Sequence, residues 1–473
     1  MKDHVKVKMM ESMMGAMMPV MNRMSEMQDP VAHDASLLFN MGQGNLIPYE
    51  YGGVDYEIEG YQTAAWIGTT LMISPVYDVY GPEVIEFMNS VCVNDFSKLN
   101  MEGLRHAVLC NDKGYILNDG VAIKVKEDRI RTYWLNPVLE YYVKNTKFKV
   151  KGEDMSGKEY FIQIDGEKSL EILEDAFEQD LHDIKFAKHR FIKYKGRTVN
   201  VIRLGMSGNL AYEIHGDMKD YEYIYKRVWH AGEKYGARKL GMHAYNLFNH
   251  TEAGFPNINL HYPLPWFETS DGLTLHMYKH PMAAMYNIAR HLSGSVGDEL
   301  ETRFMTPYDV GWGFLVKFNH DFIGREALEK VAKNPPRTVT TLLWNADDIA
   351  EVFATRFRPG EEPAENIALE FDLAAAKATF NQQYEYRADK VFAGKKEIGI
   401  TTGRIQSYTY NAMISLGFID PKYAKEGTEL TILWGTPGTR QMKVRATVAP
   451  YPFNKDWVRN EDKDVSGIPR KHK

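Results

Sequence analysis

Short apolar runs with strand-like alternation recur along the first third of the chain, separated by helical segments. A β-type run at Val76–Tyr80 precedes Gly81-Pro82-Glu83, which opens a helix with proline in its first turn. A further helix is expected over 60–70, and further strands over 106–111, 120–125 and 130–134. Because these elements do not alternate as regular βαβ units, the pattern predicts an α+β fold rather than a doubly wound sheet.

The pattern changes near Asn334-Pro335-Pro336-Arg337, a segment typical of a break between domains. Beyond it, strand-like runs are expected over 339–343, 397–403, 412–418, 429–434 and 441–446. These runs predict a separate, barrel-like β-rich domain over 336–455. The charged residues 456–473 are expected to form a poorly ordered tail.

Composition narrows the class of protein. The 473 residues, 44% hydrophobic and 25% charged, suit a globular protein of about two to four domains. A net charge of -6 gives no reason to expect a nucleic-acid surface. Cys92 and Cys110 form no CxxC motif, which fits a reducing cytoplasm, and no apolar run reaches the roughly 18–20 residues of a membrane helix. A cytoplasmic protein without membrane or nucleic-acid partners is therefore expected.

The N-terminus carries ten methionines between Met1 and Met27. Charged residues at Glu11, Arg23 and Glu26 interrupt the segment, which does not resemble a signal peptide. Methionine fills irregular gaps between packed surfaces. We therefore expect an amphipathic helix that packs on the body of the protein or on a second copy of the chain in a homo-oligomer.

Five segments carry composite motifs. The sequence PYDVGWGFLVKF at 307–318, expected as an apolar strand, precedes DFIGREAL at 321–328, a helix start. The others are CNDKGYILND at 110–119, RLGMSGNLAYEI at 203–214, GMHAYN at 241–246 with TEAGF behind it, and KEIGITTGR at 396–404. Together they resemble signatures of the glycine-cleavage T-protein (aminomethyltransferase) superfamily. The resemblance implies three domains in a ring around a central tetrahydrofolate channel.

That resemblance also implies domain boundaries. Residues 1–60 and 150–335 would form a discontinuous folate-binding domain, and 61–149 a second domain. Residues 257–305 form an insert that ordinary T-proteins lack, rich in aromatic and histidine residues. Its histidines show no convincing ligand spacing, so no metal site is expected.

Two carboxylates are implied as functional. Glu213 matches the residue that accepts paired hydrogen bonds from the amino-pyrimidine edge of the pterin. Asp119 matches the residue near the folate nitrogens, where a carboxylate orients the cofactor and handles a proton. Taken alone, the segment of Glu213 would better suit a hairpin with an exposed glutamate, and Asp119 would equally suit a residue that closes a turn. The same motifs place Met206, Phe314 and Arg404 at the folate.

Within this superfamily, the chain most resembles the tetrahydrofolate-dependent aryl O-demethylases of the vanillate, syringate and 3-O-methylgallate type. The resemblance rests on its length, its insert and the sequence of the motif at 307–328. Their reaction moves a methyl group to N5 of tetrahydrofolate, and the leaving phenolate needs a proton. Tyr245 is the implied acid, since a phenol has a matching pKa. The expected substrate residues are Tyr49, Tyr51, His243 and Trp266. Each tyrosine is also an ordinary candidate for the core.

The predicted function is therefore folate-dependent demethylation of a small methylated compound, with a methoxy-aromatic acid as the first candidate. Two alternatives stay open. One is an N- or S-demethylase for a betaine-like or sulfonium compound, held by an aromatic cage. The other is the aminomethyltransferase of glycine cleavage.

Overall fold

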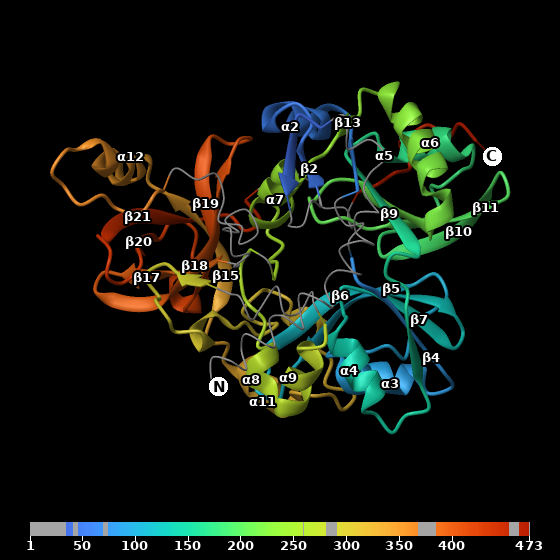
Figure 1. Cartoon of the computed structure of the whole chain (residues 1–473), viewed down its shortest axis with the longest axis horizontal. Helices are drawn as coiled ribbons and strands as arrows, with labels where there is room; N and C mark the ends of the chain where they lie inside the picture. Colours follow the sequence, from blue (N-terminus) through green and yellow to red (C-terminus); the bar gives the residue numbers. More distant parts are fainter. Residues whose placement is uncertain are drawn as a thin grey trace.

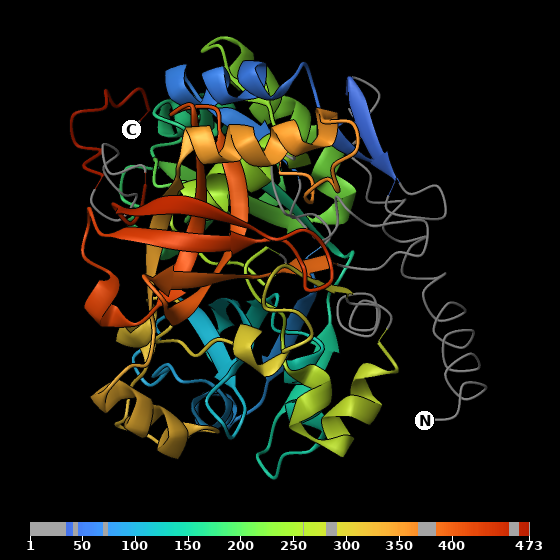
Figure 2. The same cartoon turned by 90° about the vertical axis from the view of Figure 1, so that its left-hand side faces the viewer.

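The computed structural model describes residues 35–40, 46–69, 74–258, 260–280, 291–367, 385–453 and 463–472. The methionine-rich segment and its predicted oligomer contact lie outside these residues. The described chain forms three lobes around a common centre, with a barrel at the left of Figure 1 and two sheets at the right. A quarter turn brings the barrel in front of both sheets (Figure 2). The α+β fold and the C-terminal barrel are confirmed.

The first lobe is a six-stranded sheet. Its order is β10 (Lys188–Tyr194), β11 (Arg197–Arg203), β12 (Ala211–Asp217), β9 (Glu159–Asp165), β3 (Trp66–Gly68) and β13 (Arg238–Lys239). Alternate residues of β9 and β12, such as Ile162 and Ile214, are buried against α5 (Ser169–Phe177) and α6 (Tyr221–Glu233). Because side chains alternate along a strand, the intervening residues face the centre of the molecule. The helices α2 (Val54–Thr63) and α7 (Met242–Asn246) and the hairpin of β1 (Leu37–Asn40) and β2 (Leu46–Glu50) complete this lobe.

The second lobe is a five-stranded antiparallel sheet. Its order is β5 (Leu104–Cys110), β6 (Ile116–Lys126), β7 (Arg129–Tyr133), β4 (Val76–Tyr80) and β8 (Lys151–Asp154). The helices α3 (Val84–Val91), α4 (Val138–Lys144) and α11 (Arg325–Lys333) belong to this lobe, together with α8 (Trp266–Thr269) and α9 (Asp271–Met277) from the insert.

The third lobe is a closed six-stranded barrel. It runs β15 (Thr338–Trp344), β19 (Ala412–Ile419), β18 (Lys396–Ser407), β17 (Asp389–Ala393), β20 (Glu429–Trp434) and β21 (Met442–Ala449), with α12 (Ala346–Ala354) beside it. A small parallel pair, β14 (His291–Ser293) with β16 (Glu385–Arg387), joins the insert to the segment that enters the barrel.

Three expectations from the sequence are wrong. The helix predicted over 60–70 is α2, which ends at Thr63 before β3 begins. Residues 307–318 form turns and a 3-10 helix, Gly313–Leu315, rather than a strand. The strands Trp66–Gly68 and Lys151–Asp154 each pair on the other side of the predicted domain boundary. Strand pairing depends on neighbours that are distant in sequence, which local composition does not reveal.

The motif DFIGREAL at 321–328 nonetheless has a local structural role. Gly324 adopts a φ of 88°, and a Cβ there would lie 2.4 Å from the carbonyl oxygen of Asn111. Only glycine fits such a left-handed, close-packed position without strain. The motif therefore fixes α11 against the turn that leads into β6.

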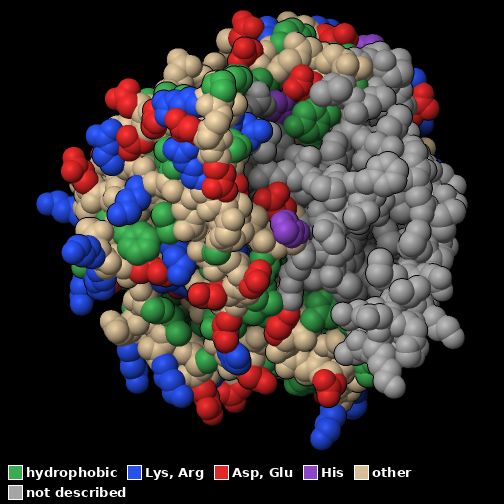
Figure 3. Space-filling view, turned by 60° about the vertical axis from the view of Figure 1, so that its left-hand side comes forward, with side chains coloured by type: hydrophobic (Ala, Val, Ile, Leu, Met, Phe, Trp, Pro, Cys, Tyr) green, Lys and Arg blue, Asp and Glu red, His purple; other side chains and the backbone are tan. Residues whose placement is uncertain are grey.

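No helix in the described ranges is long and apolar enough to cross a membrane. On the face drawn in Figure 3, basic and acidic side chains are interspersed over the described surface instead of forming a single basic patch.

A buried ion-pair network holds β4 and β7 together and reaches the six-stranded sheet. The fully buried Asp78 accepts two hydrogen bonds from Arg131, at 2.7 and 2.9 Å, and one from Arg129 at 2.9 Å. Arg131 also donates to Glu159 of β9 at 3.1 Å, and Tyr133 donates to the other oxygen of Glu159 at 3.1 Å. This network joins the first two lobes.

Removal of the Asp78 carboxylate should therefore lower the free energy of unfolding. Asp78→Ala leaves two arginines without their shared buried partner, a change that costs about 3–5 kcal/mol of unfolding free energy. Denaturant unfolding followed by circular dichroism measures the loss. The control is Glu222→Ala, which removes an exposed pair with Lys226 and should cost less than about 1 kcal/mol. Equal effects of the two substitutions would contradict a stabilising role for the network.

Candidate active site

The first group of candidate residues lies on the central face of the six-stranded sheet. Glu213 on β12 pairs directly with Gln163 on β9, so both side chains leave the sheet on the same side. Tyr245 on α7 lies over them, and Asp165 lies two residues beyond Gln163. We call Gln163, Asp165, Glu213 and Tyr245 the glutamate cluster.

Burial dominates the electrostatics of the glutamate cluster. It raises the pKa of Glu213 to about 8, although a hydrogen bond with Gln163 partly opposes the shift. The pKa of Tyr245 is raised further, by burial and then by the charge of Glu213. Among the described residues, Oε1 of Gln163 is buried without a hydrogen-bond partner. The cluster thus presents a neutral carboxyl group and an unused acceptor, which suits a polar ligand with several donors.

The glycine-rich turn beside this cluster is held by Asp165. Oγ of Ser207 lies 2.5 Å from Oδ2 of Asp165, and burial raises the pKa of that carboxyl group to about 7. A Cβ on Gly205 would lie 2.2 Å from that of Ala211, so the turn needs glycine there. Met206 packs against the core that contains Tyr245. The motif at 203–214 therefore forms one wall of the cluster.

A second group lies on the five-stranded sheet. Asp119 on β6 and His106 on β5 are diagonal neighbours across the strand pair, and Nε2 of His106 lies 3.0 Å from Oδ2 of Asp119. The hydroxyl of Tyr262, from the insert, donates to Oδ1 of Asp119 at 3.4 Å. We call these three residues the aspartate cluster.

The aspartate cluster is open on one side. The side chains of His106 and Asp119 are 21% and 14% exposed, whereas Tyr262 is fully buried. Burial, and then the charge of Asp119, raise the pKa of Tyr262 well above its usual range. The phenol therefore keeps its proton at neutral pH and holds it against a carboxylate that solvent or a ligand can reach. The sequence placed Asp119 but missed His106 and Tyr262, although the strand pairing of β5 with β6 could have indicated His106.

Ring contacts connect the two clusters. The ring of Tyr245 lies 5.8 Å from that of His250, which lies 6.3 Å from that of Phe255. Phe255 lies 5.5 Å from His106, and also 5.5 Å from Trp312 of the signature segment. Burial lowers the pKa of His250 to about 4, so its ring is neutral. We call His250, Phe255 and Trp312 the aromatic floor, because they lie between Glu213 on the six-stranded sheet and Asp119 on the five-stranded sheet.

A π-helical turn, η4 (Leu247–Glu252), attaches this floor to the barrel. Thr251 donates to the carbonyl oxygen of Gly403 on β18 at 2.7 Å, and Ser407 donates to Glu252 at 2.7 Å. Burial raises the pKa of Glu252 to about 7. π-Helical turns are costly and frequently occur at functional sites. All three lobes thus contribute to the centre of the molecule.

The predicted substrate residues fall into two places. Tyr49 packs against the core that contains Tyr245, and its ring stacks on His243 at 4.9 Å. Nδ1 of His243 lies 2.5 Å from Glu50. Tyr51 sits nearby, with Lys239 5.6 Å above its ring. Trp266 lies instead behind the aspartate cluster, where its indole N–H donates to the carbonyl oxygen of Leu117 at 2.6 Å.

Two of the predicted folate residues do not join either cluster. Phe314 is 69% exposed, because the segment that carries it is a turn in which side chains do not alternate. Arg404 is buried in the barrel with its guanidinium 5.3 Å from the ring of Trp434. Trp312, two residues before Phe314, is the residue of this signature that meets the site.

Comparison with known proteins agrees with this architecture. Residues 72–260 match the GCVT N-terminal domain, and residues 377–455 match the glycine cleavage T-protein C-terminal barrel domain. The chain belongs to this glycine-cleavage T-protein family of folate-dependent one-carbon transferases.

Particular relatives are similar over most of their length. The chain is 49% identical to a sesamin methylene transferase from Sinomonas sp. (strain No.22), over 90% of this chain and 94% of that protein. It is 30% identical to a syringate O-demethylase from Sphingobium sp. (strain NBRC 103272 / SYK-6), over 86% and 91%. The crystal structure of aminomethyltransferase T from Bartonella henselae superposes with a TM-score of 0.62 at 15% identity, covering 89% and 95%, which shows a shared fold.

The pKa of Glu213 predicts a pH-dependent stability. Its carboxyl group titrates near 4.5 when unfolded and about 8 when folded, so the folded state binds the extra proton. The stability that this proton confers is complete below pH 4.5 and is lost as the pH rises to 8. Glu213→Gln keeps a neutral side chain, and its unfolding free energy relative to wild type should rise by about 3–5 kcal/mol between pH 5 and 8.5.

Denaturant unfolding of the ligand-free protein at several pH values measures this difference. Other buried acids, such as Asp165 and Glu252, cancel in the comparison because both proteins contain them. Glu222→Gln is the control, since Glu222 is an exposed partner of Lys226 and should leave the pH profile unchanged. A constant difference between Glu213→Gln and wild type across this range would show that Glu213 titrates normally.

Proposed function

We propose that this chain transfers a one-carbon unit from the oxygen atoms of an aromatic ether to tetrahydrofolate. A methylenedioxy-arene is the first candidate, because the relative with 49% identity is named for methylene transfer from sesamin. A methoxy-arene, the donor expected from the sequence, is the second candidate and is supported by the syringate O-demethylase. Both donors present a carbon bound to a phenolic oxygen.

The glutamate cluster fits the pterin of the folate. The amino-pyrimidine edge offers adjacent N–H donors that a carboxylate accepts as a pair. Glu213 supplies the carboxyl group, and Oε1 of Gln163 is a further buried acceptor without a partner among the described residues. Tyr245 and Met206 provide apolar contact for the ring system. Donors from a pterin would favour ionisation of Glu213, which burial alone opposes.

The balance of protons distinguishes the two donors. Tetrahydrofolate supplies the nucleophilic nitrogens in both reactions. Methylene transfer forms two C–N bonds and breaks two C–O bonds, whereas methyl transfer forms one C–N bond and breaks one C–O bond. Neither reaction involves oxidation or reduction. In methylene transfer the two N–H protons pass to two phenolate oxygens, which leave as a catechol. In methyl transfer one proton passes to one phenolate. The protein must therefore both accept a proton near nitrogen and donate one near oxygen.

The aspartate cluster is the main structural support for the proposal, because it contains groups that can accept a proton and groups that can donate one. Asp119 is reachable from solvent and can accept a proton from a folate nitrogen. Tyr262 is buried, keeps its proton and donates a hydrogen bond to Asp119. After Asp119 has accepted a proton from the nitrogen, Asp119 can therefore pass a proton on to a departing phenolate, with Tyr262 hydrogen-bonded to its other oxygen. His106 holds the second oxygen of Asp119 and fixes its orientation. Tyr245 remains a second candidate acid on the other side of the aromatic floor.

One assay, repeated with each kind of donor, distinguishes the candidate substrates. The protein and tetrahydrofolate are mixed with a methylenedioxy-arene such as sesamin, with methoxy-arenes such as syringate, or with betaine and sulfonium compounds. Mass spectrometry then distinguishes 5,10-methylene- from 5-methyltetrahydrofolate. We expect the methylene product with a catechol. Transfer from cationic donors alone would support the aromatic-cage alternative, and no transfer from any aryl ether would exclude the proposal.

Substitutions in the aspartate cluster should lower the rate of transfer. Asp119→Asn removes the proton acceptor, and Tyr262→Phe removes the donor that faces it, so kcat should fall by about 10²–10⁴-fold and KM change little. The chain offers a matched control, because Tyr235 also donates to a carboxylate, Asp175, at 2.5 Å. Tyr235 follows α6, which lies on the side of the first lobe away from the centre of the molecule (Figure 1). Tyr235→Phe and Asp175→Asn should retain wild-type kcat.

The alternative acid is tested in the same assay. If Tyr245→Phe abolishes transfer from aryl ethers while Tyr262→Phe does not, the donor is Tyr245 and the role assigned to Tyr262 is wrong. Full turnover by Asp119→Asn would likewise remove the proton role of that carboxylate.

A further inference from the structure

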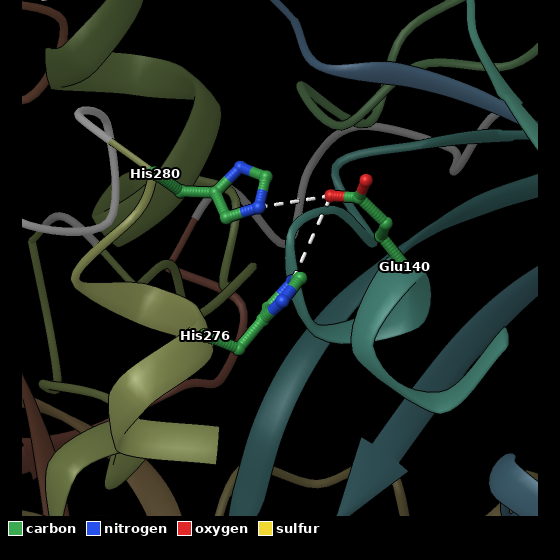
Figure 4. Close-up of side chains that lie close together, drawn as sticks. All are labelled: Glu140, His276 and His280. Carbon is green, nitrogen blue, oxygen red and sulfur yellow. Dashed lines mark ion pairs between the residues drawn. The ribbon is translucent and has the colours of Figure 1, made fainter. Parts of the chain in front are cut away.

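Three potential metal ligands meet where the insert packs on the second lobe. Glu140 belongs to α4, His276 belongs to α9, and His280 lies one turn after His276. Nε2 of His280 lies 2.9 Å from Oε2 of Glu140, and Nε2 of His276 lies 3.6 Å from the same oxygen. One ligand atom from each residue lies within 4.8 Å of the others. Figure 4 shows the three side chains converging from α4, from α9 and from the segment that follows α9.

The two oxygens of Glu140 have separate partners. Oε1 pairs with Lys144 at 2.6 Å, whereas Oε2 is the oxygen that faces both imidazoles. Ligating carboxylates are commonly held by an outer hydrogen bond of this kind. Nε2 of His276 also lies 3.1 Å from the carbonyl oxygen of Pro137. A metal bond at that nitrogen would replace this single hydrogen bond.

We propose that Glu140, His276 and His280 bind one divalent transition-metal ion of the Zn²⁺ type. Two imidazoles and one carboxylate form a donor set that suits Zn²⁺, with water in the fourth tetrahedral position. His276 lies in the last turn of α9, and the turn after the helix brings the ring of His280 to the same oxygen of Glu140. The sequence did not reveal the site because its third ligand, Glu140, lies far earlier in the chain.

A second group of similar composition shows what distinguishes this one. Glu174, Asp180 and His182 also lie close together. There, Nδ1 of His182 meets both carboxylates, at 2.7 and 3.1 Å, and Nε2 lies 3.0 Å from the carbonyl oxygen of Ile468. Both ring nitrogens are thus already used, and the group is a satisfied hydrogen-bond network.

The ion would fasten the insert to the second lobe, behind the aspartate cluster. α9 packs on α8, which carries Trp266, and the indole of Trp266 donates to the carbonyl oxygen of Leu117 at 2.6 Å. Leu117 lies two residues before Asp119 on the same strand. A metal at Glu140 would therefore brace the insert that supplies Tyr262. The metal proposal does not depend on the proposed reaction, since binding is measured directly.

The test uses the untagged full chain, freed of metal with a chelator. Titration with Zn²⁺ by calorimetry, and with Co²⁺ by visible absorption, should show one equivalent bound and the bands of tetrahedral Co²⁺. His280→Ala should weaken Zn²⁺ binding by at least about tenfold and remove those bands. Because its side chain is 29% exposed, His280 can be replaced without leaving a buried cavity.

Two control variants make the result specific. His230→Ala removes an exposed histidine paired with Glu233 at 3.0 Å, and His182→Ala removes the histidine of the second group; neither should change the stoichiometry or affinity. Wild-type protein that binds no stoichiometric Zn²⁺ would overturn the proposal. So would His280→Ala protein that circular dichroism shows to be folded and that binds Zn²⁺ as tightly as wild type.

Discussion

The meeting of the two sheets at Glu159 determines where the candidate active site lies. Glu159 begins β9 of the six-stranded sheet and accepts hydrogen bonds from Arg131 and Tyr133, both on β7 of the five-stranded sheet. Arg131 is in turn held by the fully buried Asp78. Buried charges must be paired, and here the pairing fixes one sheet relative to the other. The central faces of both sheets, which carry Glu213 and Asp119, are oriented by this contact.

Burial differs between the two carboxyl groups of the candidate site, Glu213 and Asp119. Glu213 is buried, so its pKa rises to about 8 and its carboxyl group is mostly neutral at pH 7 when no hydrogen-bond donors from a ligand are present. Asp119 stays partly open and contacts the imidazole of His106 and the hydroxyl of Tyr262. Pairs of acids in unlike environments are a common way to separate binding from proton transfer. The aromatic floor between them keeps the intervening surface apolar, which suits a flat folate and an aryl ether.

The insert contacts the second lobe in several places. It supplies Tyr262 to the aspartate cluster and Trp266 behind it, and its helix α9 approaches α4 through the proposed metal ligands. The aromatic residues of the insert were recognised from the sequence, but their partners come from strands β5 and β6.

The sequence by itself indicated the family, the α+β class and the barrel, and it named Glu213 and Asp119 as candidate carboxylates, because motifs and strand alternation are local. It could not place His106 or Tyr262 beside Asp119, or exclude Phe314 from the site, because those outcomes depend on strand pairing and on a turn that breaks alternation. Nor could it join Glu140 to the histidines of α9. Only the tertiary structure decides which polar groups share one buried space, and burial sets their charge.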